Sequence, residues 1–263
     1  MTMNVPLIRP EFLLTHEAGV RYVLRRAYAA WPEPDRSRLV YANVPRVQAF
    51  YTQGKVFWEA ARKTKELSVR YLLCYTAAHN WGKVRILFAD PHYPRRRSDL
   101  THGLSLRSGR REAGELGGEV YVEPHGLFPL LAGEERSTLV GKRVTVRALF
   151  RAAFAHGFLH LPEEGDSPVR EEEVCARDED TLLRSLRADL LHLMATFVLA
   201  NFARYEADRF FRLLDGSYDF FPLALEAYAE LCTSHLPDLV FSREISSGLL
   251  PRELPAEVLY ERT

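Results

Sequence analysis

The chain has 263 residues, which is enough for one large domain or two small ones with a substantial buried core. Its 35 lysines and arginines balance 35 aspartates and glutamates, which excludes a general attraction to nucleic acid or to an anionic membrane; a charged partner must meet a local patch. Three cysteines, at positions 74, 175 and 232, share no short spacing and predict a reducing compartment, with no zinc site and no disulfide framework.

The beginning of the chain, MTMNVPLIRPEFL, lacks the basic and apolar regions of a secretory signal. The most apolar window, residues 190–203, contains polar side chains and is shorter than the roughly 20 residues needed to cross a bilayer. We therefore expect a soluble, cytoplasmic protein with no membrane association.

Helical spacing of apolar residues predicts a helix over 17–31, which ends at Pro32 and Pro34. After a loop, Pro45 fits the first turn of a second helix running to about residue 65. A third helix is expected over 67–80, packed antiparallel to the second. Trp81, Gly82 and Lys83 interrupt it, and the run VRILFA at 84–89 is either more helix or a short strand.

The composition then changes. Residues 90–118 are rich in proline, arginine, glycine and serine, which predicts a loop, and residues 95–111 contain six arginines against the single Asp99. The alternating run at 118–124 predicts a strand, with 139–146 as its antiparallel partner. Residues 146–156 return to a helical pattern.

Residues 162–180 contain nine acidic residues and two arginines, which predicts a mobile acidic connector and the only domain boundary. The division is therefore 1–161, with the N-terminal helices, arginine-rich loop and small β element, then the connector, then 181–263 with the C-terminal helices. We expect the first and last parts to pack together as one domain.

The longest stretch without proline or glycine includes residues 182–214, where apolar residues three and four apart make a face too broad for a surface helix. This predicts a long central core helix with a bend or break near 201–206. A further helix is expected over 221–232, followed from His235 by a tail that wraps the surface. The predicted class is mainly α: a helical bundle around the long central helix, with a small antiparallel β element.

The order of features resembles the YaaC-like family of bacterial proteins. The resemblance rests on AFYTQGKVFWEAARK, LLCYTAAHNWGK, LTHGLS and FVLANFARYEADRFFRLL, and covers about residues 44–241, with its sharpest points at His102 to Leu104 and at Arg204 with Tyr205. It implies a helical body and brings no activity with it.

One motif suggests chemistry. In RRSDLTH, four residues separate Arg97 from His102, which is similar to the Arg-x(4 to 6)-His motif of HEPN-type ribonucleases. In those enzymes the arginine holds a phosphate while the histidine moves a proton, without a metal. Similar spacings occur elsewhere in the chain, including Arg187 to His192, where the histidine is expected to be a packed, hydrogen-bonded core residue. A purely structural turn at His102 and Gly103 is the alternative interpretation, and the spacing favours it over catalysis.

The arginine run has several interpretations. It could contact RNA or a nucleotide, pair with the acidic connector, or remain solvated. Arg204, at the end of an apolar run, is expected to be buried and to need a carboxylate or several carbonyls. The candidate binding residues are Arg95, Arg96, Arg107, Arg110, Arg111, Arg204 and Tyr205.

Two hypotheses follow. The first is a non-catalytic interaction or regulatory protein, such as an accessory subunit, whose arginine loop or helical face meets a protein partner or a second copy. The second is a HEPN-like, metal-independent ribonuclease with Arg97 as phosphate ligand and His102 as acid or base. We expect no cofactor and no metal, because the chain has no P-loop, Rossmann, HExxH or nucleophile-elbow motif.

Overall fold

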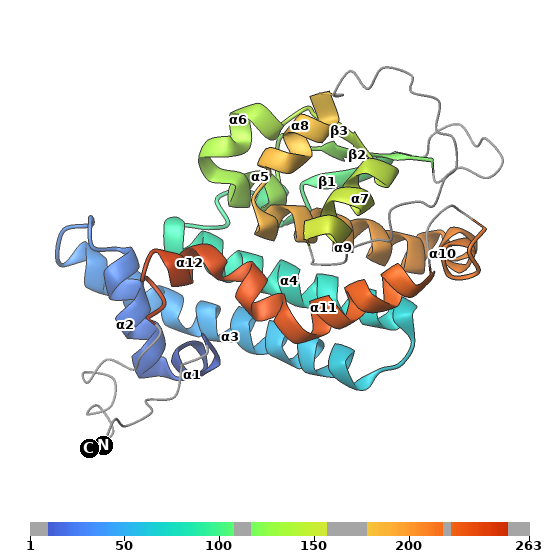
Figure 1. Cartoon of the computed structure of the whole chain (residues 1–263). Coiled ribbons are helices and arrows are strands. Elements are labelled where there is room, and N and C mark those ends of the chain that lie inside the picture. Colours follow the sequence, from blue (N-terminus) through green and yellow to red (C-terminus); the bar gives the residue numbers. More distant parts are fainter. Residues whose placement is uncertain (1–9, 108–116, 157–177, 218–221, 252–263) are drawn as a thin grey trace, which may run out of the picture.

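The computed structural model describes residues 10–107, 117–156, 178–217 and 222–251. These residues form a mainly helical body with a three-stranded antiparallel sheet on one side, which confirms the predicted class (Figure 1). Within these ranges no helix is both long enough and apolar enough to span a bilayer.

The N-terminal part consists of four helices. They are α1 (Pro10–Thr15), α2 (Glu17–Ala27), α3 (Asp35–Lys63) and α4 (Leu67–Ala89). The helices α3 and α4 lie side by side as an antiparallel hairpin (Figure 1). The prediction that α3 starts at Pro45 is wrong: it starts ten residues earlier, and Pro45 lies inside it on an exposed position. Packing along α4 holds the turns on both sides of the proline.

The helix α4 is continuous through Ala89. The expected interruption at 81–83 is therefore wrong, and 84–89 is helix, not strand. Gly82 remains helical because α5 packs closely against it: a Cβ at this position would lie 3.0 Å from a methyl carbon of Leu131 and 3.1 Å from one of Leu127. Here glycine permits a close helix contact and does not end the helix.

The middle of the chain forms the sheet and several short helices. They are the 3₁₀ helix η1 (Arg97–Leu100), β1 (Leu104–Arg107), β2 (Glu119–Val122), α5 (Leu127–Ala132), the 3₁₀ helix η2 (Gly133–Glu135), α6 (Arg136–Leu139), β3 (Arg143–Thr145) and α7 (Val146–His156). The strand order is β1-β2-β3, with Leu104 opposite Val122 and Val120 opposite Val144. The predicted strand pair and α7 are confirmed. Residues 90–118 are not all loop as expected, because they include η1 and β1.

The C-terminal part consists of α8 (Asp178–Ser185), α9 (Ala188–Tyr205), α10 (Ala207–Leu214), α11 (Pro222–Val240) and α12 (Ser242–Ser246). The expected break near 201–206 is present at Glu206. A second break, at Leu186 and Arg187, contradicts the prediction of one helix from residue 182. Arg187 has extended backbone angles, φ −59° and ψ 144°, and its side chain binds Asp189 and the carbonyl of Leu131.

Two further expectations are corrected. The helix α11 continues past residue 232 to Val240 and is followed by α12, so the segment after His235 is not an irregular tail. Residues 178–180 of the expected acidic connector belong to α8, where the carboxylate of Glu179 accepts a hydrogen bond from the backbone N–H of Thr145 at 2.9 Å. The connector's residues 162–177 lie outside the described residues.

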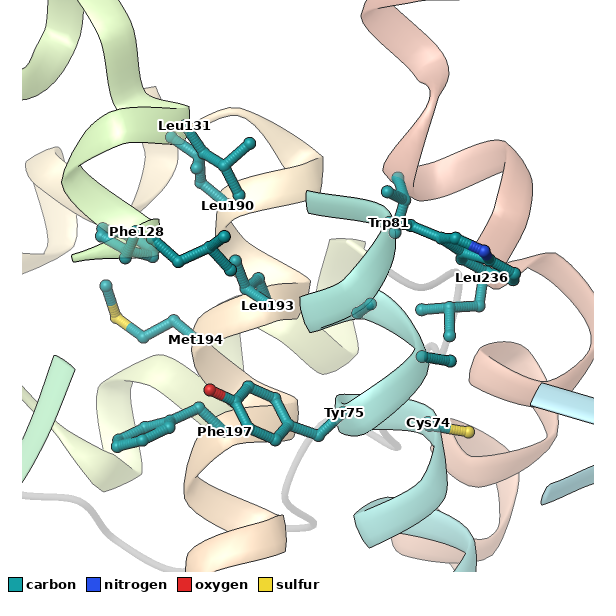
Figure 2. Packing of buried hydrophobic residues seen from close by; sticks show 14 of the residues in the cluster. Cys74, Tyr75, Trp81, Phe128, Leu131, Leu190, Leu193, Met194, Phe197 and Leu236 are labelled. Atoms are coloured by element: carbon teal, nitrogen blue, oxygen red, sulfur yellow. The ribbon is translucent and has the colours of Figure 1, made fainter. Parts of the chain in front are cut away.

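The helix α4 occupies the centre of the core, between α9 on one side and α3 with α11 on the other. Figure 2 shows this division: Tyr75 of α4 lies against Phe197 of α9, whereas Cys74 and Trp81 point the opposite way, Trp81 toward Leu236 of α11. Residues close together in α4 therefore pack against different layers, because successive side chains point in different directions around a helix.

Polar contacts connect the same layers. The indole N–H of Trp58 in α3 donates to the carbonyl of Thr233 in α11 at 2.9 Å. Arg85, buried near the C-terminal end of α4, donates to Asp189 of α9 at 2.6 Å and to Glu244 of α12 at 2.8 Å. Two carboxylates thus neutralise a cation that would be costly to bury alone.

Candidate functional site

The segment that carries the predicted arginines is held to α3 through its backbone. The side-chain amide of Asn43 donates to the carbonyl of Pro91 at 2.9 Å, and the guanidinium of Arg46 donates to the carbonyl of Tyr93. The carboxylate of Asp99 accepts from the backbone N–H groups of Arg95 at 2.9 Å and Arg96 at 3.0 Å. The arginine side chains therefore project from a fixed backbone.

The arginines differ in their partners. Arg95 forms a two-pronged ion pair with Asp90, at 2.6 and 2.9 Å. Arg96 and Arg97 are exposed, and their side chains make no hydrogen bond or ion pair with any residue that the structure describes. Arg107 lies over the ring of Tyr121, with its guanidinium carbon 4.2 Å from the ring centroid. Arg110 and Arg111 lie outside the described residues.

A pocket of about 280 Å³ adjoins this segment, and we call it the arginine pocket. Its lining includes Tyr93, Arg95, Arg96, Asp99, His125 and Arg136. Asp99 is occupied by backbone amides, and Arg136 donates to the carbonyl of Pro124 at 2.7 Å. Arg96 thus brings to the pocket a charge that no described carboxylate neutralises.

His102 leaves the same segment on a tight backbone crossing. Gly103 has φ +75° and Gly126 has φ +114°, and a Cβ on Gly103 would lie 2.4 Å from the Pro129 ring, so only glycine fits there. The N–H of Phe128 donates to the carbonyl of His102 at 3.0 Å. This crossing fixes the His102 backbone against the start of α5.

A second group of basic side chains gathers where His102 meets α4 and α9. Tyr75, His79 and Lys83 are four residues apart on α4 and so share one face of that helix. With His102 and Arg204 of α9 they form what we call the basic cluster.

The rings of the basic cluster are in contact. The hydroxyl of Tyr75 lies 2.6 Å from Nδ1 of His102. The rings of His79 and His102 are 5.1 Å apart in an edge-to-face arrangement, and Phe197 packs 5.7 Å from His102. Nε2 of His79 is buried and has no hydrogen-bond partner among the described residues.

The charges around these rings are all positive. Burial, together with Lys83 and His102, lowers the pKa of His79 to about 3. Partial burial, Arg204 and Lys83 lower the pKa of His102. Burial raises the pKa of Tyr75 although Arg204 opposes the shift, so the phenol keeps its proton. It can therefore donate to Nδ1 of His102, which leaves the other ring nitrogen of that histidine as the N–H donor.

The structure changes the view of two predicted site residues. Arg204 is exposed, not buried as expected; its guanidinium carbon lies 4.9 Å from the ring centroid of Tyr205, which is itself 70% exposed. The charged groups that lower the pKa of His102 are Arg204 and Lys83, and Arg97 is not one of them. Arg97 lies in η1 with no contact to His102 among the described interactions.

His192 lies in the core, as expected for a structural histidine. It is 2% exposed, its Nδ1 is 2.9 Å from the hydroxyl of Tyr228, and its Nε2 is 3.3 Å from Nδ1 of His156. Both ring nitrogens are therefore engaged. No group of three or more histidine, cysteine or carboxylate side chains suited to a metal ion occurs in the described part of the chain.

A family comparison includes the whole arginine segment and most of the basic cluster. The sequence model of the YaaC-like protein family matches residues 12–164. The chain belongs to the YaaC-like family. The match covers α4 and His102 but ends before α9, so Arg204 lies outside it. No curated protein and no solved structure matches this YaaC-like chain.

Sequence reasoning missed Tyr75, His79 and Lys83 in this YaaC-like chain. A signal was available, because three polar or ionisable residues at four-residue spacing in a helical pattern predict one shared face. Their meeting with His102 could not be read from spacing, because a turn at Gly103 and Gly126 creates it.

Proposed function

We propose that this YaaC-like chain is a non-catalytic interaction or regulatory protein whose arginine segment binds an acidic stretch of a partner protein. The observation that carries the proposal is the contrast between Arg95, paired with Asp90, and Arg96 and Arg97, which are exposed on a fixed backbone without carboxylate partners among the described residues. Unpaired guanidinium groups on a fixed backbone favour binding to carboxylates, because only side-chain freedom is lost when the partner binds.

The shape of the surface supports the same function. The arginine pocket places His125 beside Arg95 and Arg96, so it can accept a carboxylate side chain. Because the whole chain is electrically neutral, attraction to a partner would come from this local patch and would weaken with salt.

The HEPN-like ribonuclease with Arg97 and His102 remains the competing hypothesis, and no observation favours it. It requires the two side chains to act on one phosphate. Its requirement is directly testable, since such an enzyme would cleave RNA without a metal.

The experiment measures binding of a fluorescent glutamate-rich peptide by anisotropy at low salt, for the parent protein and an Arg96→Ala/Arg97→Ala variant. Each exposed charge pair contributes about 0.2–1 kcal/mol. Losing two should therefore weaken binding by about two- to thirtyfold. The matched control is Arg36→Ala/Arg38→Ala, which removes two α3 arginines already paired with Glu33 and Asp35.

A parallel arm incubates single-stranded RNA with the parent protein in EDTA. RNA cleavage that disappears in a folded His102→Ala variant would replace the proposal with the ribonuclease. Equal peptide binding by the two double variants would also refute it, because the arginine segment would then contribute nothing specific.

A further inference from the structure

We propose that the basic cluster is a binding site for a phosphate dianion, either inorganic phosphate or the terminal group of a phosphomonoester. This site is distinct from the arginine pocket and does not depend on the proposed function. It lies where α4, the His102 loop and the end of α9 meet.

His79 has a buried ring nitrogen without a hydrogen-bond partner among the described residues. Buried polar atoms in proteins are nearly always hydrogen-bonded, and leaving one unpaired is costly. Nε2 of His79 is buried with no partner among the described residues, although the His102 ring is only 5.1 Å away. A ligand oxygen at the cluster would satisfy an N–H at this position.

His102 also has a ring nitrogen that is free to donate, and its loop is held in place. The Tyr75 phenol occupies Nδ1 of His102 at 2.6 Å, so the opposite nitrogen of that ring carries the hydrogen and is free to donate. The backbone crossing at Gly103 and Gly126 fixes this loop. The histidine is thus oriented before any ligand arrives, which lowers the entropy lost on binding.

Lys83 and Arg204 add two positive charges to the basic cluster. Lys83 is partly buried, and its ammonium nitrogen lies 5.0 Å from the ring centroid of Phe50, with no ion pair to any described carboxylate. Arg204 likewise has no carboxylate partner in the described part of the chain. Two permanent cations that no described carboxylate neutralises, beside two neutral imidazoles that can donate hydrogen bonds, favour an anion as the ligand.

The number of donors indicates the class of anion. A carboxylate accepts well from one guanidinium or two N–H groups, whereas a phosphate dianion has three equivalent oxygens and twice the charge. An arginine, a lysine and two imidazole N–H groups match the second arrangement. Binding of phosphate by these donors needs neither a metal nor a covalent bond.

The test follows the ring signals of the nine histidines by NMR while inorganic phosphate is added at neutral pH and constant ionic strength. His79→Gln and His102→Gln assign the two signals of interest. We expect saturable shifts confined to His79 and His102, with no comparable change on adding acetate. An arm with a nucleoside 5′-monophosphate distinguishes the source, since tighter binding than free phosphate would indicate an ester ligand.

Two variants remove one charge each from the cluster. Lys83→Met keeps the aliphatic stem, and Arg204→Gln changes an exposed side chain that the fold does not need; each should weaken phosphate binding by about tenfold or more. The matched control, Lys55→Met, removes a lysine of α3 paired with Glu59 and should bind as the parent does. Thermal unfolding of each variant checks that it is folded.

Several results would overturn the site. They are the absence of saturable histidine shifts, equal binding by Arg204→Gln and Lys55→Met, or binding that is lost in Arg96→Ala/Arg97→Ala but kept in Arg204→Gln. The last result would place the anion in the arginine pocket. Failure of glutamate-peptide binding leaves the phosphate experiment unaffected, so the two proposals can fail separately.

Discussion

The histidines show how the surroundings decide what a residue type does. His192 and His102 both contact a tyrosine hydroxyl, at 2.9 and 2.6 Å. In the core, the second nitrogen of His192 is also occupied, by His156. At the edge of α4, the second nitrogen of His102 has no described partner, and the neighbouring charges are cations. The first arrangement stabilises the fold, whereas the second leaves binding capacity.

The buried His192 predicts a loss of stability in mild acid. Burial and the neighbouring His156 lower its pKa from 6.5 to about 4, although Asp189 opposes the shift. Between about pH 6.5 and pH 4, His192 binds a proton in the unfolded chain but stays neutral in the folded chain. Stability is therefore complete above about pH 6.5 and falls by about 3 kcal/mol as the pH approaches 4. Denaturant unfolding across this window measures the loss.

A His192→Gln variant is the control for this pH dependence. Glutamine retains a polar contact to Tyr228 and cannot be protonated, so its stability should vary less steeply over the same pH range. Some slope should remain, because His79 is also held neutral. Parallel curves for the parent and the variant would show that another group is responsible.

Spacing along the chain identified His102 but not its neighbours. It paired the histidine with Arg97, from which four residues separate it, because a short sequence motif joins only residues close in the chain. The structure instead places His102 beside His79 and Tyr75, and brings Arg204 near from α9. Contacts of this kind depend on the crossing of separate elements, which periodicity does not encode.

At the scale of elements, the interior proline of α3 is a weak point. Pro45 removes one helical N–H, and its ring disturbs the preceding turn. The side chain is exposed, so replacing it loses little packing. Pro45→Ala should raise the free energy of unfolding by about 1–2 kcal/mol, after allowance for the greater freedom of the unfolded chain. Thermal or denaturant unfolding measures the gain.

Pro237 in α11 is the comparison for this prediction. It also lies inside a helix, but it is buried, so Pro237→Ala loses apolar contacts that offset the backbone gain. Its stabilisation should therefore be smaller than that of Pro45→Ala. The reverse order would mean that packing holds the α3 proline more tightly than its exposure suggests.

The elements that sequence predicts well are those with a long, unbroken pattern. The apolar periodicities of α2, α4 and α9 and the alternation of β2 are visible directly. The breaks are harder to predict. The helix continues through Gly82 because α5 packs where a side chain at this position would lie. Arg187 interrupts the helix because its guanidinium binds Glu135 and the carbonyl of Leu131. In both cases a tertiary contact overrides the local preference.

At the scale of the whole molecule, α4 requires partners from both ends of the sequence. Its one face packs on α9 and the other on α3 and α11. Buried bonds link these layers, including the hydroxyl of Tyr71 to the carbonyl of Leu225 and the ion pair of Arg85 with Asp189. The family match, which ends at residue 164, stops before α9 and α11.

A fragment ending at residue 164 should therefore not fold as the whole chain does. Without α9, α11 and α12, Tyr71, Tyr75 and Trp81 would lose the helices that bury them, and Arg85 would lose both carboxylates. We expect no cooperative thermal transition and strong binding of a hydrophobic dye, whereas the full chain should unfold in a single transition.

Co-expression with residues 178–263 provides the control, because the added helices should restore the sharp transition. A fragment that unfolds cooperatively on its own would instead make the acidic stretch at 162–180 a true domain boundary. The expectation of one packed domain would then be abandoned.

The crossing of Gly103 and Gly126 has an evolutionary consequence. A Cβ at Gly126 would lie 2.4 Å from the backbone nitrogen of Gly103, and a Cβ at Gly103 would strike Pro129. Neither position can acquire a side chain while the other backbone stays in place. Substitution in this loop is thus blocked by backbone crowding at two sites, whereas no such crowding restricts the exposed position beside them, His102. Descendants of this chain can therefore change the side chain at position 102 more easily than the path of the loop.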